Sequence, residues 1–135
     1  MGRLRWLVRR LGLDAAVTFT GQVPNERRGA YYRGCRVYVT MSEHEGFCVP
    51  VVEAMHLGQP VVGFASSGVP ETMGDAGILV EQKRHDVIGE AIALLADESP
   101  LRVRLVARGH AQARRYSAEA VETRFAAILA EALGG

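Results

Sequence analysis

The chain has 135 residues, which is enough for one domain around a single core. Hydrophobic residues make up 48% of it and charged residues 23%, as in ordinary globular domains. The formal net charge of +1 excludes a general attraction to nucleic acid.

Signals for export or for membrane insertion are missing from the sequence. No apolar run approaches the roughly 20 residues of a spanning helix, and no signal peptide is recognisable. The two cysteines, Cys35 and Cys48, have neither the spacing of metal ligands nor that of a redox motif. We therefore expect a cytoplasmic protein with reduced thiols and no metal site.

The first expected element is a short helix that ends at Gly12. Its apolar residues recur at helical spacing and are Leu4, Leu7, Val8 and Leu11. Four arginines and Trp6 on the same stretch are also typical of an interfacial membrane helix. Because the stretch is short and acidic residues follow soon, we favour a solvated polar face, and membrane contact stays unsupported.

Two strands and a helix are expected next. Residues 17–20 predict a strand, residues 27–34 a short helix, and residues 36–41 a second strand. The helix carries Tyr31 and Tyr32, which could stack on a base. We expect them instead to pack in the core or on the surface.

The most informative stretch runs from Ser42 to Val62. A polar loop is followed by an amphipathic helix over about residues 49–57, which Gly58 closes. A buried strand is expected over residues 60–64. Within this stretch two acidic residues are placed so that both can face one ligand.

These acidic residues are Glu45, at the mouth of the expected helix, and Glu53, about a turn and a half inside it. Backbone amides of Gly46, Phe47 and Cys48, with the positive end of the helix dipole, attract phosphate. Two carboxylates beside a phosphate are better placed to accept hydrogen bonds from hydroxyl groups. A molecule with hydroxyls on both sides of a diphosphate is a nucleotide sugar.

The rest of the sheet follows from the same alternation of strands and helices. Residues 65–71 read as an irregular loop and residues 78–80 as a last short strand. Near-continuous apolar strands alternating with helices predict a parallel α/β sheet, which binds ligands beyond the carboxyl ends of its strands. The loops over residues 42–47 and 66–71 both leave such ends and can line one crevice.

From Asp86 onward the chain is expected to be helical, with a break at residues 97–100. The second of these helices carries five arginines, which we interpret as a solvated face and not as a nucleic-acid patch: Arg102, Arg104, Arg108, Arg114 and Arg115. The last helix, from about Ala118, is expected to bury its apolar stripe, Val121, Phe125, Ile128 and Leu129.

With these residues the chain resembles the donor-binding half of a retaining glycosyltransferase of the two-Rossmann-domain (GT-B) type. The resemblance rests on an E-x7-E signature, Glu45-GFCVPVV-Glu53, and covers nearly the whole chain. The segments in register with the signature are VTFTGQV at 17–23, VYVTMS at 37–42, SGVPE at 67–71 and GILVE at 77–81. Together they imply a Rossmann-like α/β fold that forms half of a GT-B enzyme.

The resemblance also implies an activity. Family members move a sugar from a nucleotide diphosphate sugar to an acceptor hydroxyl, with retention at the anomeric carbon and without a required metal. Glu45 would hold the sugar hydroxyls as the catalytic residue, and Glu53 would hold the ribose hydroxyls of UDP or GDP. Further donor-binding positions implied in this way are Ser42, Gly46, Phe47 and Cys48, with Val23 and Gln22 near the base; possible further contacts are His44, Ser67, Gly68 and Glu71.

Other readings of the same residues stay open. Glu45 could form a capping box with Ser42, in the S-x-x-E pattern, and Glu53 could be a solvated helix residue. His44 could act as an acid or base, although a surface role is favoured. Glu71 could cap a helix after Pro70 or contact the ligand. Two carboxylates also suggest a glycosidase, but a phosphate-binding helix mouth has no purpose there.

Three positions depart from the family pattern. Cys48 and Ser67 stand where the pattern usually has glycine, and Ala118 stands where a tryptophan is common. We expect the Cys48 side chain to narrow the space near the sugar. Ser67 matters less if it keeps an ordinary backbone conformation.

Relative to the family, the chain lacks an acceptor-binding domain and the first two strands of the donor domain. Residues 1–135 are therefore interpreted as a partial C-terminal nucleotide-sugar-binding domain. The strand at 17–20 must pair beside the strand at 36–41, in a four-stranded sheet, or depend on another chain. Because terminal helices brace the two halves in the family, an exposed apolar strip is expected when one half is absent.

Three hypotheses follow. The chain is the donor domain of a glycosyltransferase, or one subunit of a split enzyme whose acceptor domain arrives in trans, or a non-catalytic nucleotide-sugar-binding module. We expect the isolated chain to bind donor weakly and to transfer nothing.

Overall fold

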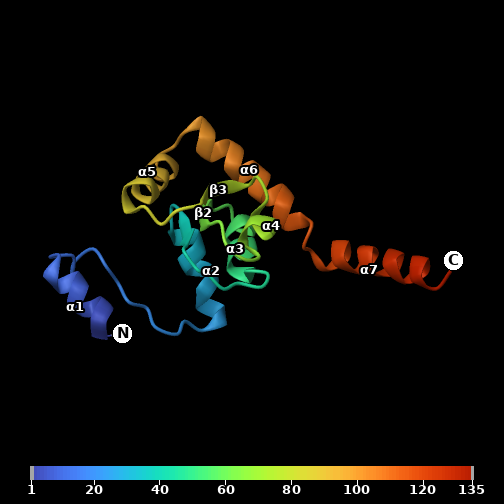
Figure 1. The fold of residues 1–135 in the computed structure, drawn as a ribbon, viewed down its shortest axis with the longest axis horizontal. Helices are drawn as coiled ribbons and strands as arrows, with labels where there is room; N and C mark the ends of the chain where they lie inside the picture. The colour runs from blue at the N-terminus through green and yellow to red at the C-terminus, as the bar shows by residue number, and fades with distance from the viewer. Residues whose placement is uncertain (1, 135) are drawn as a thin grey trace.

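The computed structural model describes residues 2–134, and a small parallel sheet lies at its centre (Figure 1). The strands are β1, Tyr38–Thr40, β2, Val61–Phe64, and β3, Gly77–Val80, in the order β1-β2-β3. Both pairs are parallel, with Val39 opposite Val62 and Val62 opposite Ile78. The predicted α/β, Rossmann-like class is therefore confirmed.

Helices follow each strand, as parallel connections require. Their bounds are α1, Gly2–Arg10, α2, Asn25–Gly34, α3, Val49–His56, α4, Val69–Met73, α5, His85–Ala96, α6, Pro100–Arg114, and α7, Ala118–Ala132. In Figure 1, α2 to α6 surround the sheet, whereas α1 and α7 lie at opposite ends of the molecule.

The core has one apolar cluster on each face of the sheet. Val61 belongs to the cluster that includes Met55 of α3 and Met73 of α4, and Val62 belongs to the cluster that includes Leu95 of α5. All of these side chains are fully buried or nearly so. Neighbouring strand residues point to opposite faces, so β2, the middle strand, contributes side chains to both clusters.

The strand predicted over residues 17–20 does not form within the described residues. The sheet has three strands, and not the four that direct pairing beside the strand at 36–41 would give. Val17 and Phe19 are half-buried on the side of α1, where the Arg5 guanidinium lies 5.0 Å from the centre of the Phe19 ring. Thr20 and Val39 of β1 line one pocket, so the segment runs close to the edge strand without forming a ladder. An apolar alternating run forms a strand only where a neighbour supplies its hydrogen bonds.

Other boundaries also differ from prediction. The stretch over residues 65–71, expected to be an irregular loop, gives way to α4 at Val69, with Pro70 in the first turn where its missing N–H costs nothing. Helix α2 begins at Asn25, two residues before the predicted start, and β1 covers only residues 38–40. Helix α3 agrees with its prediction to within one residue.

The prediction that α7 buries its apolar stripe is wrong. Val121, Phe125, Ile128 and Leu129 are 50%, 61%, 55% and 43% exposed. The helix projects from the end of α6 into solvent (Figure 1). The helix therefore presents an exposed apolar strip.

None of the helices within residues 2–134 combines the length and the apolar character required to cross a bilayer.

Candidate functional site

Two loops at the carboxyl ends of β1 and β2 are joined by hydrogen bonds. The hydroxyls of Ser66 and Ser67 both donate to the carbonyl of Glu43, at 3.0 and 2.8 Å. The amide of Gly68 donates to the carbonyl of Glu45 at 3.0 Å. The loops predicted to line one crevice are therefore neighbours at one edge of the sheet.

Gly68 lets these loops approach each other closely. A Cβ atom at this position would lie 1.5 Å from the carbonyl oxygen of Gly46 and 2.7 Å from its carbonyl carbon. No residue with a side chain fits there unless the backbone moves. Gly68 therefore has a structural role that its place in the sequence motif did not reveal.

Two residues in this region adopt the left-handed backbone conformation that favours glycine. Cys48 has a φ of 55° and Ser67 a φ of 51°. These are the positions at which the family pattern usually has glycine, so the pattern follows from the backbone. Ser67 was expected to matter less only if it kept an ordinary backbone conformation, and it does not keep one.

The side chain of Cys48 lies in the core. It is only 4% exposed and belongs to the same cluster as Val51 and Met55. Burial raises the pKa of its thiol, so the group stays neutral at neutral pH. The expectation that this side chain narrows the space near the sugar does not match its burial.

The mouth of α3 has free backbone donors. Within residues 2–134, the amides of Gly46, Phe47 and Cys48 donate no hydrogen bond to the protein. The residue that precedes the helix is Cys48, which provides no side-chain cap, and Pro50 in the first turn has no N–H. Since Ser42 and Glu45 lie before the start of the helix, they do not form the capping box considered above. Such an uncapped N-terminus is suited to an anion.

The aromatic ring of Phe47 marks the outer side of this mouth. It is 45% exposed and meets the ring of Tyr116 edge-on, with centroids 4.7 Å apart. The Tyr116 hydroxyl donates to the carbonyl of Glu71 at 3.3 Å, and the hydroxyl of Thr72 donates to the carbonyl of Phe47. Helix α4 and the turn after α6 therefore support the loop that carries Phe47. Sequence reasoning gave Tyr116 no such role.

Three further residues predicted to contact the ligand, Glu71, His44 and Ser42, lie at or near the surface. Glu71 lies in the first turn of α4, where an acid is favourable to the helix dipole, and its side chain is exposed. Of the polar loop residues, His44 is exposed and Ser42 is half-buried. Their roles stay predictions.

Glu43 was not predicted as a site residue, but its side chain links the loop after β1 to the segment that follows β3. Its carboxylate lies 2.6 Å from the Lys83 ammonium, which also lies 4.7 Å from the centre of the Phe64 ring. Lys83 holds the pKa of the Glu43 carboxyl below its usual range. The two residues are 40 apart in sequence, so only the fold brings them together.

Glu53 makes specific contacts and is not simply a solvated helix residue. The Tyr32 hydroxyl of α2 donates to its Oε2 atom at 3.0 Å, and Nη2 of Arg28 lies 3.9 Å from its Oε1 atom. Arg28 and Tyr32 are four residues apart and share one face of α2. The helical spacing could have paired them, but it does not indicate that this face meets Glu53.

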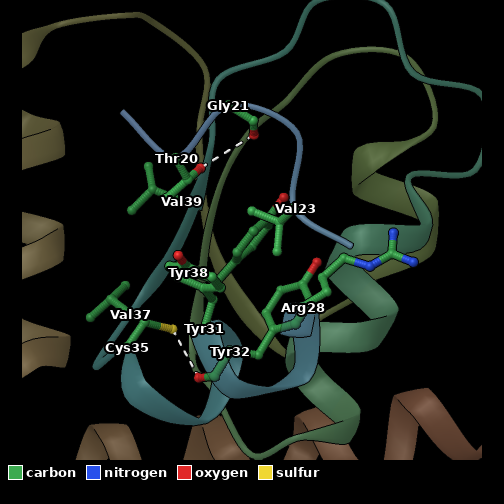
Figure 2. Close-up of a pocket in the computed structure, with 10 residues that line it drawn as sticks. All are labelled: Thr20, Gly21, Val23, Arg28, Tyr31, Tyr32, Cys35, Val37, Tyr38 and Val39. Atoms are coloured by element: carbon green, nitrogen blue, oxygen red, sulfur yellow. Dashed lines mark hydrogen bonds between the residues drawn. The ribbon is translucent and has the colours of Figure 1, made fainter. Parts of the chain in front are cut away.

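A pocket of about 410 Å³ lies between α2, β1 and the segment that precedes α2 (Figure 2). Val23, the residue expected near the base, lies in its wall with Arg28 and Tyr32. The same arginine and tyrosine also line a smaller pocket of about 160 Å³ that contains Glu53. The structure therefore brings the predicted base and ribose positions to adjoining pockets. Glu45 lies outside both.

Burial changes the acidity of the aromatic side chains at the first pocket. It raises the pKa of Tyr38 to about 12, so this hydroxyl stays protonated at neutral pH. Arg28 is the one cationic side chain in the wall, and its side chain is 45% exposed. The pocket therefore offers apolar and aromatic surface with a single positive group, which suits a planar ring that carries carbonyl oxygens.

Within the part of the chain that the structure describes, no three His, Cys, Asp or Glu side chains are grouped closely enough to hold a metal ion.

Comparison with known proteins shows which family the chain matches. Residues 2–112 match the sequence model of the family described as glycosyl transferases group 1. The chain is 35% identical over 113 residues to the O-antigen chain mannosyltransferase B of Escherichia coli. That match covers 84% of this chain and 30% of the mannosyltransferase.

Two solved structures show the same fold. One is the C-terminal domain of the group 1 family protein LpcC from Francisella tularensis, with a TM-score of 0.73, 28% identity and coverage of 87% of this chain and 62% of that chain. The other is HepE of Anabaena in complex with UDP-glucose, with a TM-score of 0.81, 22% identity and coverage of 96% and 36%. The chain thus spans less than two thirds of each of these proteins.

Proposed function

Because the chain belongs to the group 1 family of glycosyl transferases, we propose that residues 1–135 are part of the C-terminal, donor-binding domain of such an enzyme. The domain would hold a nucleotide diphosphate sugar for transfer of the sugar to an acceptor hydroxyl. The observation that carries this proposal is the free amide mouth of α3 at Gly46, Phe47 and Cys48, on the same helix as Glu53.

The nucleoside would lie along α2. Its base would enter the pocket beside Val23, and its ribose hydroxyls would donate to the Glu53 carboxylate in the adjoining pocket. Arg28 and Tyr32 line both pockets, so a continuous ligand would pass them. The complex of HepE with UDP-glucose supports UDP as the first nucleotide to test.

The diphosphate would rest on the amides at the mouth of α3. Those donors are fixed before the ligand arrives, so they would stabilise the negative charge that grows on the departing phosphate at little cost in reorganisation. Glu45 would hold the sugar hydroxyls and align the anomeric carbon with the acceptor. In the reaction, the bond from that carbon to the phosphate oxygen breaks and a bond to the acceptor oxygen forms. The hydroxyl proton leaves with the nucleotide phosphate.

The acceptor would bind to a domain outside this chain. The match to only 30% of the E. coli mannosyltransferase supports this view. The exposed apolar strip of α7, with Phe125 and Ile128, is the surface we assign to that domain, in cis or on a second polypeptide. The chain alone would bind the donor weakly and transfer nothing.

A titration followed by amide NMR tests the proposal. UDP and GDP are added separately to the 135-residue chain. The amide signals of Gly46, Phe47 and Cys48 should show the largest shifts. Glu53→Gln should weaken binding of the nucleotide. Glu90→Gln is the matched control, because Glu90 is exposed on α5 and lines neither pocket. Shifts confined to α5 or α6 would refute the assignment of the site.

A further inference from the structure

Tyr32 connects the core to the proposed ribose site. Its ring is buried in the core cluster and meets the ring of Tyr38 with centroids 5.6 Å apart. Its hydroxyl reaches from α2 to α3 and donates to Oε2 of Glu53. Because packing holds the ring, the hydroxyl is held at one place, and the carboxylate that accepts from it is held as well.

Within residues 2–134, the other oxygen of Glu53, Oε1, has no partner as close as the Tyr32 hydroxyl is to Oε2. Its Oε1 atom lies 3.9 Å from Nη2 of Arg28, which is beyond hydrogen-bond distance. That nitrogen instead donates to Oδ1 of Asn25 at 2.7 Å. A carboxylate can accept about four hydrogen bonds. Glu53 therefore keeps acceptor capacity while its orientation is set from one side.

The position of this contact makes it relevant to a ligand. Tyr32 lies in the walls of both adjoining pockets, and Glu53 lines the smaller one. The Glu53 side chain is 32% exposed, so its free acceptor positions are accessible. Burial and the neighbouring carboxylate raise the pKa of Tyr32 well above its ordinary value, which keeps the hydroxyl a donor at neutral pH.

We propose that Tyr32 is a positioning residue that orients the Glu53 carboxylate for the two ribose hydroxyls of the nucleotide. This inference rests on the proposed function, because it requires that Glu53 accepts from the ribose. The orientation of the carboxylate that would bind the ribose then depends on a buried tyrosine of another helix, α2. The affinity gained from the ribose hydroxyls should therefore fall when only the tyrosine hydroxyl is removed.

The experiment compares two ligands, UDP and 2′,3′-dideoxyuridine 5′-diphosphate, which lacks both ribose hydroxyls. Each is titrated into the 135-residue chain by NMR, and the ratio of the two affinities measures what the hydroxyls contribute. Tyr32→Phe keeps the ring and should weaken UDP roughly 3- to 10-fold, as for one hydrogen bond, with little change for the dideoxy ligand. Tyr31→Phe is the control for the ratio: Tyr31 lines the larger pocket but not the pocket that contains Glu53, so any effect should fall equally on both ligands and leave the ratio unchanged.

The possible outcomes separate the inference from its premise. If Glu53→Gln leaves the wild-type ratio unchanged, Glu53 does not bind the ribose and the proposed function of that residue fails. If Glu53→Gln lowers the ratio and Tyr32→Phe does not, only the inference fails. Equal weakening of both ligands by Tyr32→Phe would indicate a purely structural role and also overturns it. Glu53→Asp, which withdraws the carboxylate from Tyr32 but keeps its charge, should lower the ratio as Tyr32→Phe does.

Discussion

Replacing Gly68 by alanine should separate the two loops of the site. The new Cβ would lie 1.5 Å from the carbonyl oxygen of Gly46, whereas real Cβ atoms essentially never approach closer than 3.0 Å. The loops must therefore move apart by more than 1 Å. The obstacle is backbone, so no side chain can rotate away to relieve the contact.

That movement would break the hydrogen bonds that join the loops. Three of them lie at 2.8 to 3.0 Å, from the two serine hydroxyls to Glu43 and from the Gly68 amide to Glu45. At about 0.5 to 1.5 kcal/mol each, the loss of all three amounts to about 1.5 to 4.5 kcal/mol. Alanine also stabilises the folded protein by about 0.4 to 1 kcal/mol relative to glycine, because it restricts the unfolded chain. We expect a net loss of about 0.5 to 4 kcal/mol in the free energy of unfolding.

Urea unfolding followed by circular dichroism measures this loss. Gly46→Ala is the matched control on the opposite loop, because a Cβ there meets nothing within 4 Å. The control should stay within about 0.5 kcal/mol of wild type, as expected for a substitution without a steric conflict. If Gly68→Ala is as stable as the control, the close approach of the loops is not a feature of the folded protein.

Two further predictions concern the same loops. Ser67→Val should cost about 1 kcal/mol more than Ser66→Val in urea unfolding, because both lose a hydrogen bond to Glu43 but only at position 67 is the β-branched side chain forced to a positive φ; equal costs would argue against the left-handed conformation. Lys83→Met should return the pKa of the Glu43 carboxyl to its usual range in an NMR titration. Since the folded pKa is lowered, the ion pair stabilises the protein above the unfolded pKa of Glu43 and loses that contribution as pH falls. The variant should therefore differ most from wild type at neutral pH and least in acid, and a constant difference across pH would contradict this.

The sequence predicted the elements whose residues carry their own local signals. Helix α3 has apolar residues at helical spacing and a glycine after its end, and its predicted bounds agree with the structure. The parallel order of the strands followed from their alternation with helices. The position of Glu53 on one helix and of Glu45 before it also followed from sequence spacing.

The failures concern features that depend on distant parts of the chain. Residues 17–20 have the alternation of a strand, but a strand needs a partner with free hydrogen-bonding groups. The apolar stripe of α7 predicts that the helix packs against something, yet within residues 2–134 the stripe stays exposed. The contact between Tyr32 and Glu53 joins residues 21 apart and depends on how α2 meets α3. No local pattern distinguishes Tyr32 from Tyr31 in this respect.

A crystal structure of the chain soaked with UDP tests the central proposal most directly. The account predicts that the diphosphate lies against the amides of Gly46, Phe47 and Cys48, with the ribose hydroxyls on the carboxylate of Glu53 and the base beside Val23. A nucleotide bound elsewhere, or a ribose that does not contact Glu53, would contradict it.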